Sequence, residues 1–309
     1  MPETLVHCSV CGSDDLRIVD SDISLCRCLR CSLIFRNPRP SESEISAYYS
    51  QEDQYDDWLA HEHSRDLLWR RRLQMVDRYG RRGPLLDVGT GIGQFLSFAK
   101  HKYEIDGTEV SKRAIEIART KYGLNLRRGA LEELDFGDRR FEVITLFHVL
   151  EHVHEPRNLL LRCRELLSPG GIVIVAVPNE LKSWKRWIKS ALTLVGYRQS
   201  HGYGQYGLRA IRMDRAGEEI HLSHFTISTI RNLFEVCGLN IVDVDIDPCH
   251  ALIGAKQFGY EFAYRTCRLV YGVMRLQLGE ALWLVAQRDG DRVAFHSDRH
   301  KLRPLAPSK

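Results

Sequence analysis

Residues 85–100, LLDVGTGIGQFLSFAK, constrain the fold of this 309-residue chain more than any other segment. An apolar run ends at Asp87, a glycine-rich turn follows, and a helical pattern begins at Gln94. A strand, a glycine turn and a helix in this order are typical of the first unit of a parallel α/β sheet. The third glycine of the turn is Gly93, one position before the dinucleotide fingerprint GxGxxG requires it. The segment therefore predicts the α/β class without identifying a ligand.

The next predicted strand, YEIDGTEV at residues 103–110, supplies an acidic side chain at its carboxyl end. A carboxylate at the position of Glu109 can accept hydrogen bonds from both hydroxyls of a ribose that lies across the strand ends. Ser111 then predicts the N-cap of a helix over KRAIEIARTKYG. The two strand-and-helix units together favour a ligand that contains a ribose.

Four cysteines near the start of the chain form two CxxC pairs that are separated by sixteen residues. Two such pairs present four thiolates to one tetrahedral ion, which is the ligand pattern of a structural zinc ribbon. The segments LRIV at 16–19 and SLIF at 32–35 suit its short strands. The predicted zinc ligands are Cys8, Cys11, Cys28 and Cys31. We leave out Cys26, because its spacing fits a CxxC pair less well.

The motifs along the chain resemble those of class I S-adenosylmethionine-dependent methyltransferases, in the subfamily with an N-terminal four-cysteine zinc ribbon. The matching segments are DVGTGIG, TEVS, RRGALEEL, FEVITLFHVLEHV, LLSPGGIVIVAVPN and HLSHFTISTIRNLFEVCGL. The resemblance implies an α/β fold with a Rossmann-like, seven-stranded, mostly parallel sheet, helices on both faces, and a small zinc ribbon before it. NIVDVDID and EALWLVAQ would be the final two strands, the last one antiparallel.

The resemblance implies S-adenosyl-L-methionine as the cofactor. Glycines let the backbone approach its methionine part, amides at a helix start can receive its carboxylate, and Asp87 can meet its ammonium. The family's adenine loop often has an acidic residue where this chain has Ala130, so backbone groups there would contact the adenine. The expected cofactor-binding residues are Asp87, Gly89, Thr90, Gly91, Gly93, Glu109, Ala130, Leu131 and Phe147.

The segment HVLEHV at 148–153 follows the fourth predicted strand and precedes a helix that begins at Pro156. Ligands of parallel sheets bind at this edge, so His148, Glu151 and His152 are candidate catalytic residues. Three interpretations stay open. His152 could be the general base for a hydroxyl acceptor, or the polar groups could only fix the strand end.

The third interpretation is a second divalent metal ion. Ubiquinone-pathway O-methyltransferases and a plant small-RNA methyltransferase carry a similar ExxEH with a later histidine that holds such an ion. Here His148 takes the first position, and His221 or His224 could provide the later ligand. A carboxylate with several imidazoles suits zinc, manganese or iron better than magnesium.

Residues 181–217 concentrate the positive charge of the chain. They carry eight basic side chains and one carboxylate, a net charge of +7, whereas the whole chain has a net charge of +4. Tryptophans alternate with the basic positions in LKSWKRWIKSALTLVGY, as in an interfacial helix, and a second amphipathic stretch, FGYEFAYRTCRLVYGVMRLQL, follows. We interpret 181–217 as a basic lid for an anionic or lipid-linked acceptor that could contact a membrane surface; an insertion that only packs on the domain is the alternative.

We expect four parts: a zinc ribbon at 1–40, a helical linker or cover at 41–82, the methyltransferase domain at 83–290, and a polar tail at 291–309. The absence of a long apolar run or a signal peptide pattern predicts a cytoplasmic protein without a transmembrane segment. The favoured function is O-methylation of a small molecule, a sugar or a lipid-linked glycan, because the ribbon is charge-neutral. An RNA methyltransferase that holds RNA with ribbon and lid, and a nonenzymatic binding protein with a degenerate domain, are the alternatives.

Overall fold

The computed structural model describes residues 2–51, 53–186, 188, 204–214, 216–250 and 255–291. A seven-stranded sheet crosses the molecule in the order β10-β11-β8-β7-β4-β5-β6. Its strands are β4 (Pro84–Val88), β5 (Glu104–Glu109), β6 (Arg127–Arg128), β7 (Phe141–Phe147), β8 (Leu167–Pro178), β10 (Leu239–Ile246) and β11 (Ala281–Arg288). β11 runs antiparallel to both of its neighbours, and the pairs among β4 to β8 are parallel. The predicted Rossmann-like sheet with an antiparallel last strand is confirmed.

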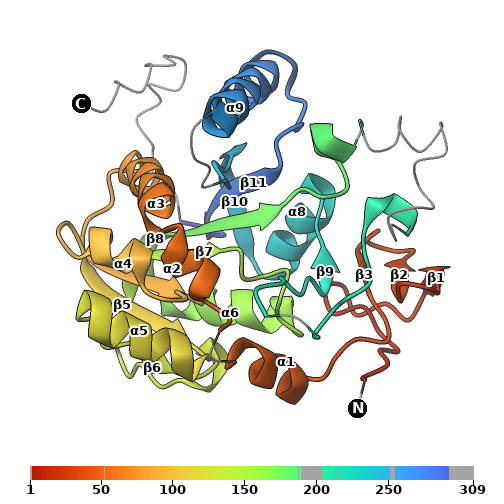
Figure 1. Cartoon of the computed structure of the whole chain (residues 1–309), viewed down its shortest axis with the longest axis horizontal. Coiled ribbons are helices and arrows are strands. Elements are labelled where there is room, and N and C mark those ends of the chain that lie inside the picture. Colours follow the sequence, from red (N-terminus) through yellow and green to blue (C-terminus); the bar gives the residue numbers. More distant parts are fainter. Residues whose placement is uncertain are drawn as a thin grey trace.

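Helices pack on both faces of this sheet (Figure 1). One face packs against α6 (Pro156–Leu166) and α8 (Ile227–Val236), and the other against α3 (Glu62–Asp77), α4 (Gln94–Ala99) and α5 (Lys112–Tyr122). The short 3-10 helix η1 (Leu131–Glu133) follows β6, and α9 (Ala255–Met274) lies between β10 and β11 in the chain. The strands between these layers read as nearly continuous apolar runs because both of their faces are buried.

Local signals explain where the helices next to the sheet begin and end. Ser111 is the N-cap of α5 and accepts a hydrogen bond from the amide of Ala114, and Gly123 ends that helix in the left-handed conformation. Pro156 occupies the first turn of α6, where its missing N–H costs no helical hydrogen bond. These elements bring the ends of β4, β5 and β7 to one edge of the sheet.

The N-terminal residues form a second sheet, in which β1 (Leu16–Asp20), β2 (Leu25–Cys28) and β3 (Ile34–Arg36) are antiparallel. Its fourth strand, β9 (Ser223–His224), comes from a distant part of the sequence. Ile34 pairs with His224 and Phe35 with Ser223, and the Arg36 amide donates to the Leu222 carbonyl over 2.8 Å. The strands predicted near 16–19 and 32–35 are present, whereas the participation of β9 was not foreseen.

Three helices, α1 (Glu42–Tyr49), α2 (Asp56–Ala60) and α3, connect the ribbon to the sheet. Side chains from all three face a cavity at the carboxyl ends of the strands. The predicted interfacial helix in 181–217 lies largely outside the described residues, which include only 181–186, 188, 204–214 and 216–217 of that segment. The described part contains the short 3-10 turn η2 (Gln205–Gly207).

Candidate functional site

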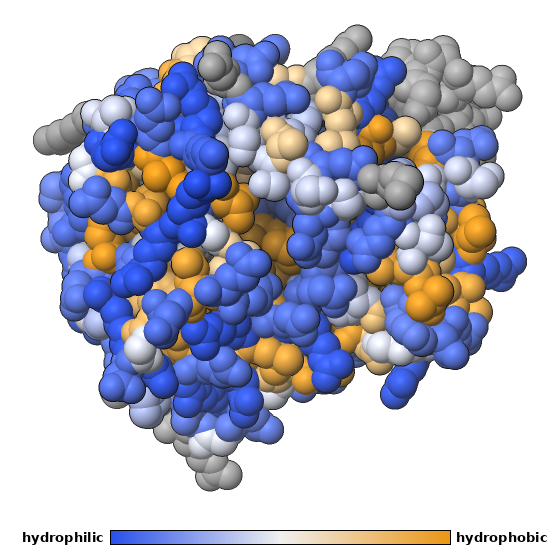
Figure 2. Space-filling view, turned by 90° about the horizontal axis from the view of Figure 1, so that it is seen from below, coloured by the Kyte–Doolittle hydropathy of each residue, from blue (hydrophilic) through white to orange (hydrophobic). Residues whose placement is uncertain are grey.

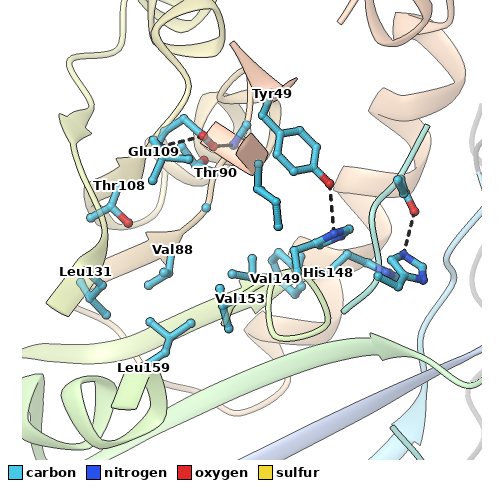
Figure 3. A pocket seen from close by; sticks show the side chains of 18 of the residues that line it. Tyr49, Val88, Thr90, Thr108, Glu109, Leu131, His148, Val149, Val153 and Leu159 are labelled. Carbon is cyan, nitrogen blue, oxygen red and sulfur yellow. Dashed lines mark hydrogen bonds and ion pairs between the residues drawn. The ribbon is translucent and has the colours of Figure 1, made fainter. Parts of the chain in front are cut away.

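A cavity of about 1130 Å³ runs along the carboxyl ends of the parallel strands. Residues after β4 and β5 line one end of it, and residues of the HVLEHV segment and of 217–221 line the other. Figure 3 shows this arrangement, with Glu109 and Thr108 on one side, Tyr49 and His148 on the other. The molecular surface is hollowed near its middle in the view from below, with hydrophobic residues at the bottom of the hollow (Figure 2).

Glu109 is buried at the first end of the cavity, with an exposed fraction of 7%. One carboxylate oxygen accepts from the amides of Val110 and Ser111 over 2.8 and 2.9 Å, and the other accepts from the Gly91 amide over 2.8 Å. These bonds fix the carboxylate at the edge of the cavity while it retains capacity to accept further hydrogen bonds. Burial raises the pKa of Glu109, and the backbone amides oppose that effect.

The glycine turn brings backbone rather than side chains to this end. Gly89 and Gly91 line the cavity at φ values of 62° and 57°, where residues with a side chain are rare. A Cβ on Gly91 would lie 2.8 Å from the ring of Trp58, which covers the turn from α2. Four other predicted cofactor residues also line the cavity: Thr90, Ala130, Leu131 and Phe147.

Asp87 and Gly93 do not line the cavity, although both were predicted to contact the cofactor. The Asp87 carboxylate lies beneath the turn and accepts a hydrogen bond of 2.6 Å from the Thr145 hydroxyl. Burial raises the pKa of Asp87 to about 7. Gly93 is the N-cap of α4 at φ 84°, and a Cβ there would lie 2.7 Å from Leu124, so its position serves packing between α4 and α5. Any contact of these two residues with a ligand stays a prediction.

His148 begins the HVLEHV segment at φ 58°, an uncommon conformation for a residue with a side chain. Its Nδ1 lies 3.2 Å from Glu151 Oε1, and its Nε2 lies 3.3 Å from Asp247 Oδ2. Arg72 donates two hydrogen bonds to the same Asp247 carboxylate, over 2.9 and 2.6 Å. Burial would lower the pKa of His148, but the bonds to Asp247 and Glu151 outweigh it and raise the pKa to about 9.

His152 also lines the cavity, and its ring lies next to Tyr49, with the two ring centroids 6.0 Å apart. Its Nδ1 donates to the Ile220 carbonyl over 2.7 Å, and the Tyr49 hydroxyl lies 3.1 Å from the same nitrogen. Nε2 therefore carries the lone pair, 3.9 Å from Glu151 Oε1. Burial lowers the pKa of His152.

Glu151, His152 and His221 form a cluster whose ligand atoms all lie within 4.8 Å of one another. Glu151 has an exposed fraction of 1%, and among the described residues neither of its oxygens has a hydrogen bond of good geometry. The ion pair with His148, whose Nδ1 lies 3.2 Å from Oε1, meets part of its charge, and Oε2 is left to face a further positive partner. The set of one carboxylate and two imidazoles matches the donors that zinc, manganese and iron accept.

His224 lies outside this cluster and forms a second group with Glu180 and His221, whose ligand atoms also lie within 4.8 Å of one another. His224 is buried behind the cavity, where its Nδ1 lies 2.6 Å from Glu180 Oε2. The other Glu180 oxygen lies 3.2 Å from His221 Nδ1, so this carboxylate joins the two imidazoles. His221 Nε2 lies 3.3 Å from Glu219 Oε2.

The four ribbon cysteines converge as their spacing predicts. Cys8 Sγ lies 3.6 Å from Cys31 Sγ, and Cys11 Sγ lies 3.5 Å from Cys28 Sγ. Four sulfurs around a tetrahedral zinc with bonds of about 2.3 Å would be separated by similar distances, so the site fits the ion. Cys26 is buried nearby but does not belong to the cluster.

Sequence reasoning did not single out several residues of the site, because nothing in their local sequence marks them. Tyr49 reaches the cavity from α1, Glu180 follows β8, and Asp247 is the first residue after β10. A further cluster of Cys249, His250 and Glu280 lines the same cavity, with Lys185 Nζ 2.5 Å from Glu280 Oε2. Each of these positions depends on chain segments that meet only in the folded molecule.

Comparison with known proteins gives a consistent result. The family described as "Methyltransferase domain" matches residues 60–244. The ubiquinone biosynthesis O-methyltransferase of Alkalilimnicola ehrlichii is 33% identical over 153 residues, which cover 46% of this chain and 61% of that protein. The enzyme of the same name from Coxiella burnetii strain RSA 493 is 29% identical over 137 residues, covering 40% and 56%. The matched region thus spans less than two thirds of either relative.

Two solved structures share the fold. Magnesium protoporphyrin IX methyltransferase from Synechocystis PCC 6803, solved with bound SAH, superposes with a TM-score of 0.52 at 11% identity, over 81% of this chain and 100% of that one. A chain of the complex between the Haloferax volcanii Trm112 methyltransferase activator and a methyltransferase gives 0.50 at 17% identity, over 79% and 99%. In the part of the chain that the structure describes, no helix has both the length and the apolar character needed to span a bilayer.

Proposed function

The chain belongs to the S-adenosylmethionine-dependent methyltransferases, and from that membership we propose that it methylates a hydroxyl oxygen of a small-molecule acceptor, with sugars and lipid-linked glycans included in that class. One observation carries the proposal: a single cavity joins the Glu109 end to the cluster of Glu151, His152 and His221. A cofactor at the first end would have its reactive methyl group directed towards hydroxyl-activating groups at the second.

Different parts of the cavity suit the ribose, the methionine part and the adenine of the cofactor. Glu109 would accept the ribose hydroxyls, and the backbone of Gly89 and Gly91 would lie against the methionine part. The apolar side chains Val88, Leu131, Val149, Val153 and Leu159 would surround the adenine. When bound, the cofactor supplies an already activated methyl group, so the protein has to orient the acceptor and remove its proton.

We propose that Glu151, His152 and His221 hold a divalent cation beside the acceptor. Such an ion lowers the pKa of a hydroxyl bound to it. The buried Glu151 carboxylate, whose Oε2 has no hydrogen-bond partner among the described residues, and the lone pair on His152 Nε2 support this assignment. The chain's own contribution is to fix those donors: the Ile220 carbonyl sets the His152 tautomer, and Glu180 orients His221 through Nδ1. Without an ion, His152 Nε2 would be the base that accepts the proton.

The charge of the ribbon favours a small molecule over RNA. A ribbon that holds a phosphodiester backbone should be basic, whereas this one is neutral, because five arginines between 1 and 40 balance five acidic residues. Two relatives are named for O-methylation in ubiquinone biosynthesis, which is methyl transfer to a small molecule.

The test is a labelling experiment with methyl-tritiated S-adenosylmethionine and extracts of cells that lack this protein. After incubation with the purified protein, the extract is separated into RNA, protein, lipid and water-soluble fractions. We expect label in the lipid or small-molecule fraction, and loss of that label with the Glu109→Ala variant. Label confined to RNA would overturn the acceptor class, and no transfer to any fraction would overturn the enzymatic proposal.

A further inference from the structure

Helix α9 carries an exposed apolar stripe. The exposed fractions are 82% for Phe258, 76% for Phe262, 56% for Leu269 and 74% for Val273. Spacings of four, seven and four residues place these side chains on one face of the helix. Exposed phenylalanines in a row are unusual on a water-facing helix, because single exposed apolar residues are normally scattered.

The opposite face of α9 holds the helix firmly on the molecule. Tyr264 and Cys267 are buried there against Ile246, and the partly buried Trp184 and Leu278 complete this cluster. Arg268 donates two hydrogen bonds to Asp245, over 3.0 and 2.6 Å. The apolar stripe is therefore presented by an anchored helix at the edge of the molecule, where Figure 1 shows α9 standing beyond the sheet.

The charges around the stripe are positive. Arg265 is exposed beside the stripe, and Lys256 and Arg275 are exposed at the two ends of the helix. The helix has one acidic residue, Glu261, whose carboxylate lies 2.7 Å from Arg71 and 2.9 Å from Arg265. Aromatic and aliphatic side chains on one face, with flanking cations and a neutralised carboxylate, are the features of a helix that lies in the interface of an anionic bilayer.

We propose that α9 docks the protein on anionic lipid membranes, with Phe258, Phe262, Leu269 and Val273 in the headgroup region. The segments at both ends of α9 also line the cavity, through His250 before it and Glu280 and Ala281 after it. Docking would therefore hold the acceptor end of the cavity close to the bilayer. This position would favour methyl transfer to a lipid-soluble acceptor, a consequence that rests on the proposed function.

The experiment is sedimentation of the full chain with sucrose-loaded vesicles, in the absence of acceptor, so that its readout does not depend on methyl transfer. We expect binding to phosphatidylcholine vesicles that contain about one third phosphatidylglycerol, and much weaker binding to pure phosphatidylcholine or at high salt. The double variant Phe258→Ser/Phe262→Ser should lower the partition coefficient by about tenfold or more.

The matched control is Val6→Ser/Ile18→Ser, which removes two apolar side chains of similar exposure, 68% and 69%, from the ribbon. This control should bind vesicles like the wild type, and circular dichroism should show that both variants are folded. Failure of the wild type to bind the anionic vesicles, or equal binding by the α9 variant, would overturn the proposal. A wild-type dimer that the α9 variant converts to a monomer would assign the stripe to a second copy instead.

Discussion

At the scale of single residues, the buried carboxylate of Glu109 is the strongest candidate for cofactor recognition. Glu109→Ala removes the acceptor for two ribose hydroxyls, and hydrogen bonds to a charged group contribute about 1.5–3 kcal/mol. We expect the dissociation constant for S-adenosylhomocysteine, measured by calorimetry, to rise by one to two orders of magnitude. The control is Glu116→Ala on α5, an exposed carboxylate 3.4 Å from Arg113, which should leave the affinity unchanged. Unchanged affinity in the Glu109 variant would refute the ribose assignment.

Asp87 predicts a pH dependence of cofactor binding. Its pKa in the folded protein is about 7, above the value of 3.8 for an unperturbed aspartate, because burial disfavours the charged form. This group contributes stability that is complete below about pH 4 and is lost as the pH rises through about 7. The cofactor's ammonium favours the ionised form, so binding should release a proton near neutrality.

The affinity for S-adenosylhomocysteine should therefore increase as the pH rises from about 6 to about 8, and then level off. Calorimetry in two buffers of different ionisation enthalpy measures the proton release directly. Asp87→Asn should abolish both the release and the slope, while Thr145→Val, which removes only the hydrogen-bond donor to Asp87, should retain the slope. If the affinity of the wild type for S-adenosylhomocysteine did not change with pH, Asp87 would not be the residue that meets the bound ammonium.

The position of His152 predicts that its substitution lowers turnover without weakening cofactor binding. His152→Ala removes either a metal donor or a base, and general acid–base groups typically contribute about 10²- to 10⁴-fold to the rate. We expect kcat to fall within this range while the affinity for the cofactor changes less than about twofold. A metal assay of the purified protein distinguishes the two roles, because only a ligand role predicts loss of bound ion in both His152→Ala and Glu151→Gln. The exposed His61→Ala is the control, and a fully active His152 variant would leave only a structural role.

At the scale of elements, the pairing of β3 with β9 connects the ribbon cysteines to the site. Cys28 ends β2 and Cys31 lies in the turn between β2 and β3, and β3 holds β9 through backbone hydrogen bonds. The amides of Leu222 and Ser223 in turn donate to the Glu151 carbonyl over 2.7 and 3.1 Å. Loss of ribbon structure should therefore loosen the segment that carries His221 and His224.

This connection predicts that Cys8→Ser/Cys31→Ser lowers turnover by about tenfold or more, since small displacements of reacting groups are costly. Binding of S-adenosylhomocysteine should persist, because Glu109 and the glycine turn belong to other elements. Cys26→Ser is the matched control: this cysteine lies in β2 but outside the ligand cluster, so the variant should keep most of its activity. If the double variant turned over normally with its ribbon unfolded, the coupling would be refuted.

The elements themselves were largely predictable from sequence. The turn at 89–93, the cap at Ser111 and the proline at 156 act within a few residues, so their signals are visible in the sequence alone. β9 was missed, because its two residues have no strand pattern of their own and form a strand only by pairing with β3. The described structure also shows that α9 is a long helix, where the sequence indicated only an amphipathic stretch.

At the scale of the whole molecule, sequence predicted the edge of the sheet that carries the site but not the complete set of side chains there. His148, Glu151 and His152 follow a strand end, so the topology alone brings His148 and His152 to the cavity and buries Glu151 next to them. Tyr49, Glu180 and Asp247 arrive from three separate segments, and their contacts depend on how the covering helices and loops pack. Burial of Arg72 with Asp247 could not be foreseen for the same reason, because exposure is a property of the folded chain.

Because β9 lies far along the sequence, it is also synthesised long after the strand with which it pairs. A ribosome releases the four cysteines and β3 long before it releases Ser223 and His224, so the edge of β3 stays without its partner while most of the chain is synthesised. An unpaired strand edge on a nascent chain invites pairing with the wrong strand. Early capture of zinc by the cysteines would shorten the ribbon's disordered phase but would leave that edge open. The ribbon sheet therefore gains its fourth strand only after most of the chain has been synthesised. A fragment that ends before β9 should be prone to aggregate.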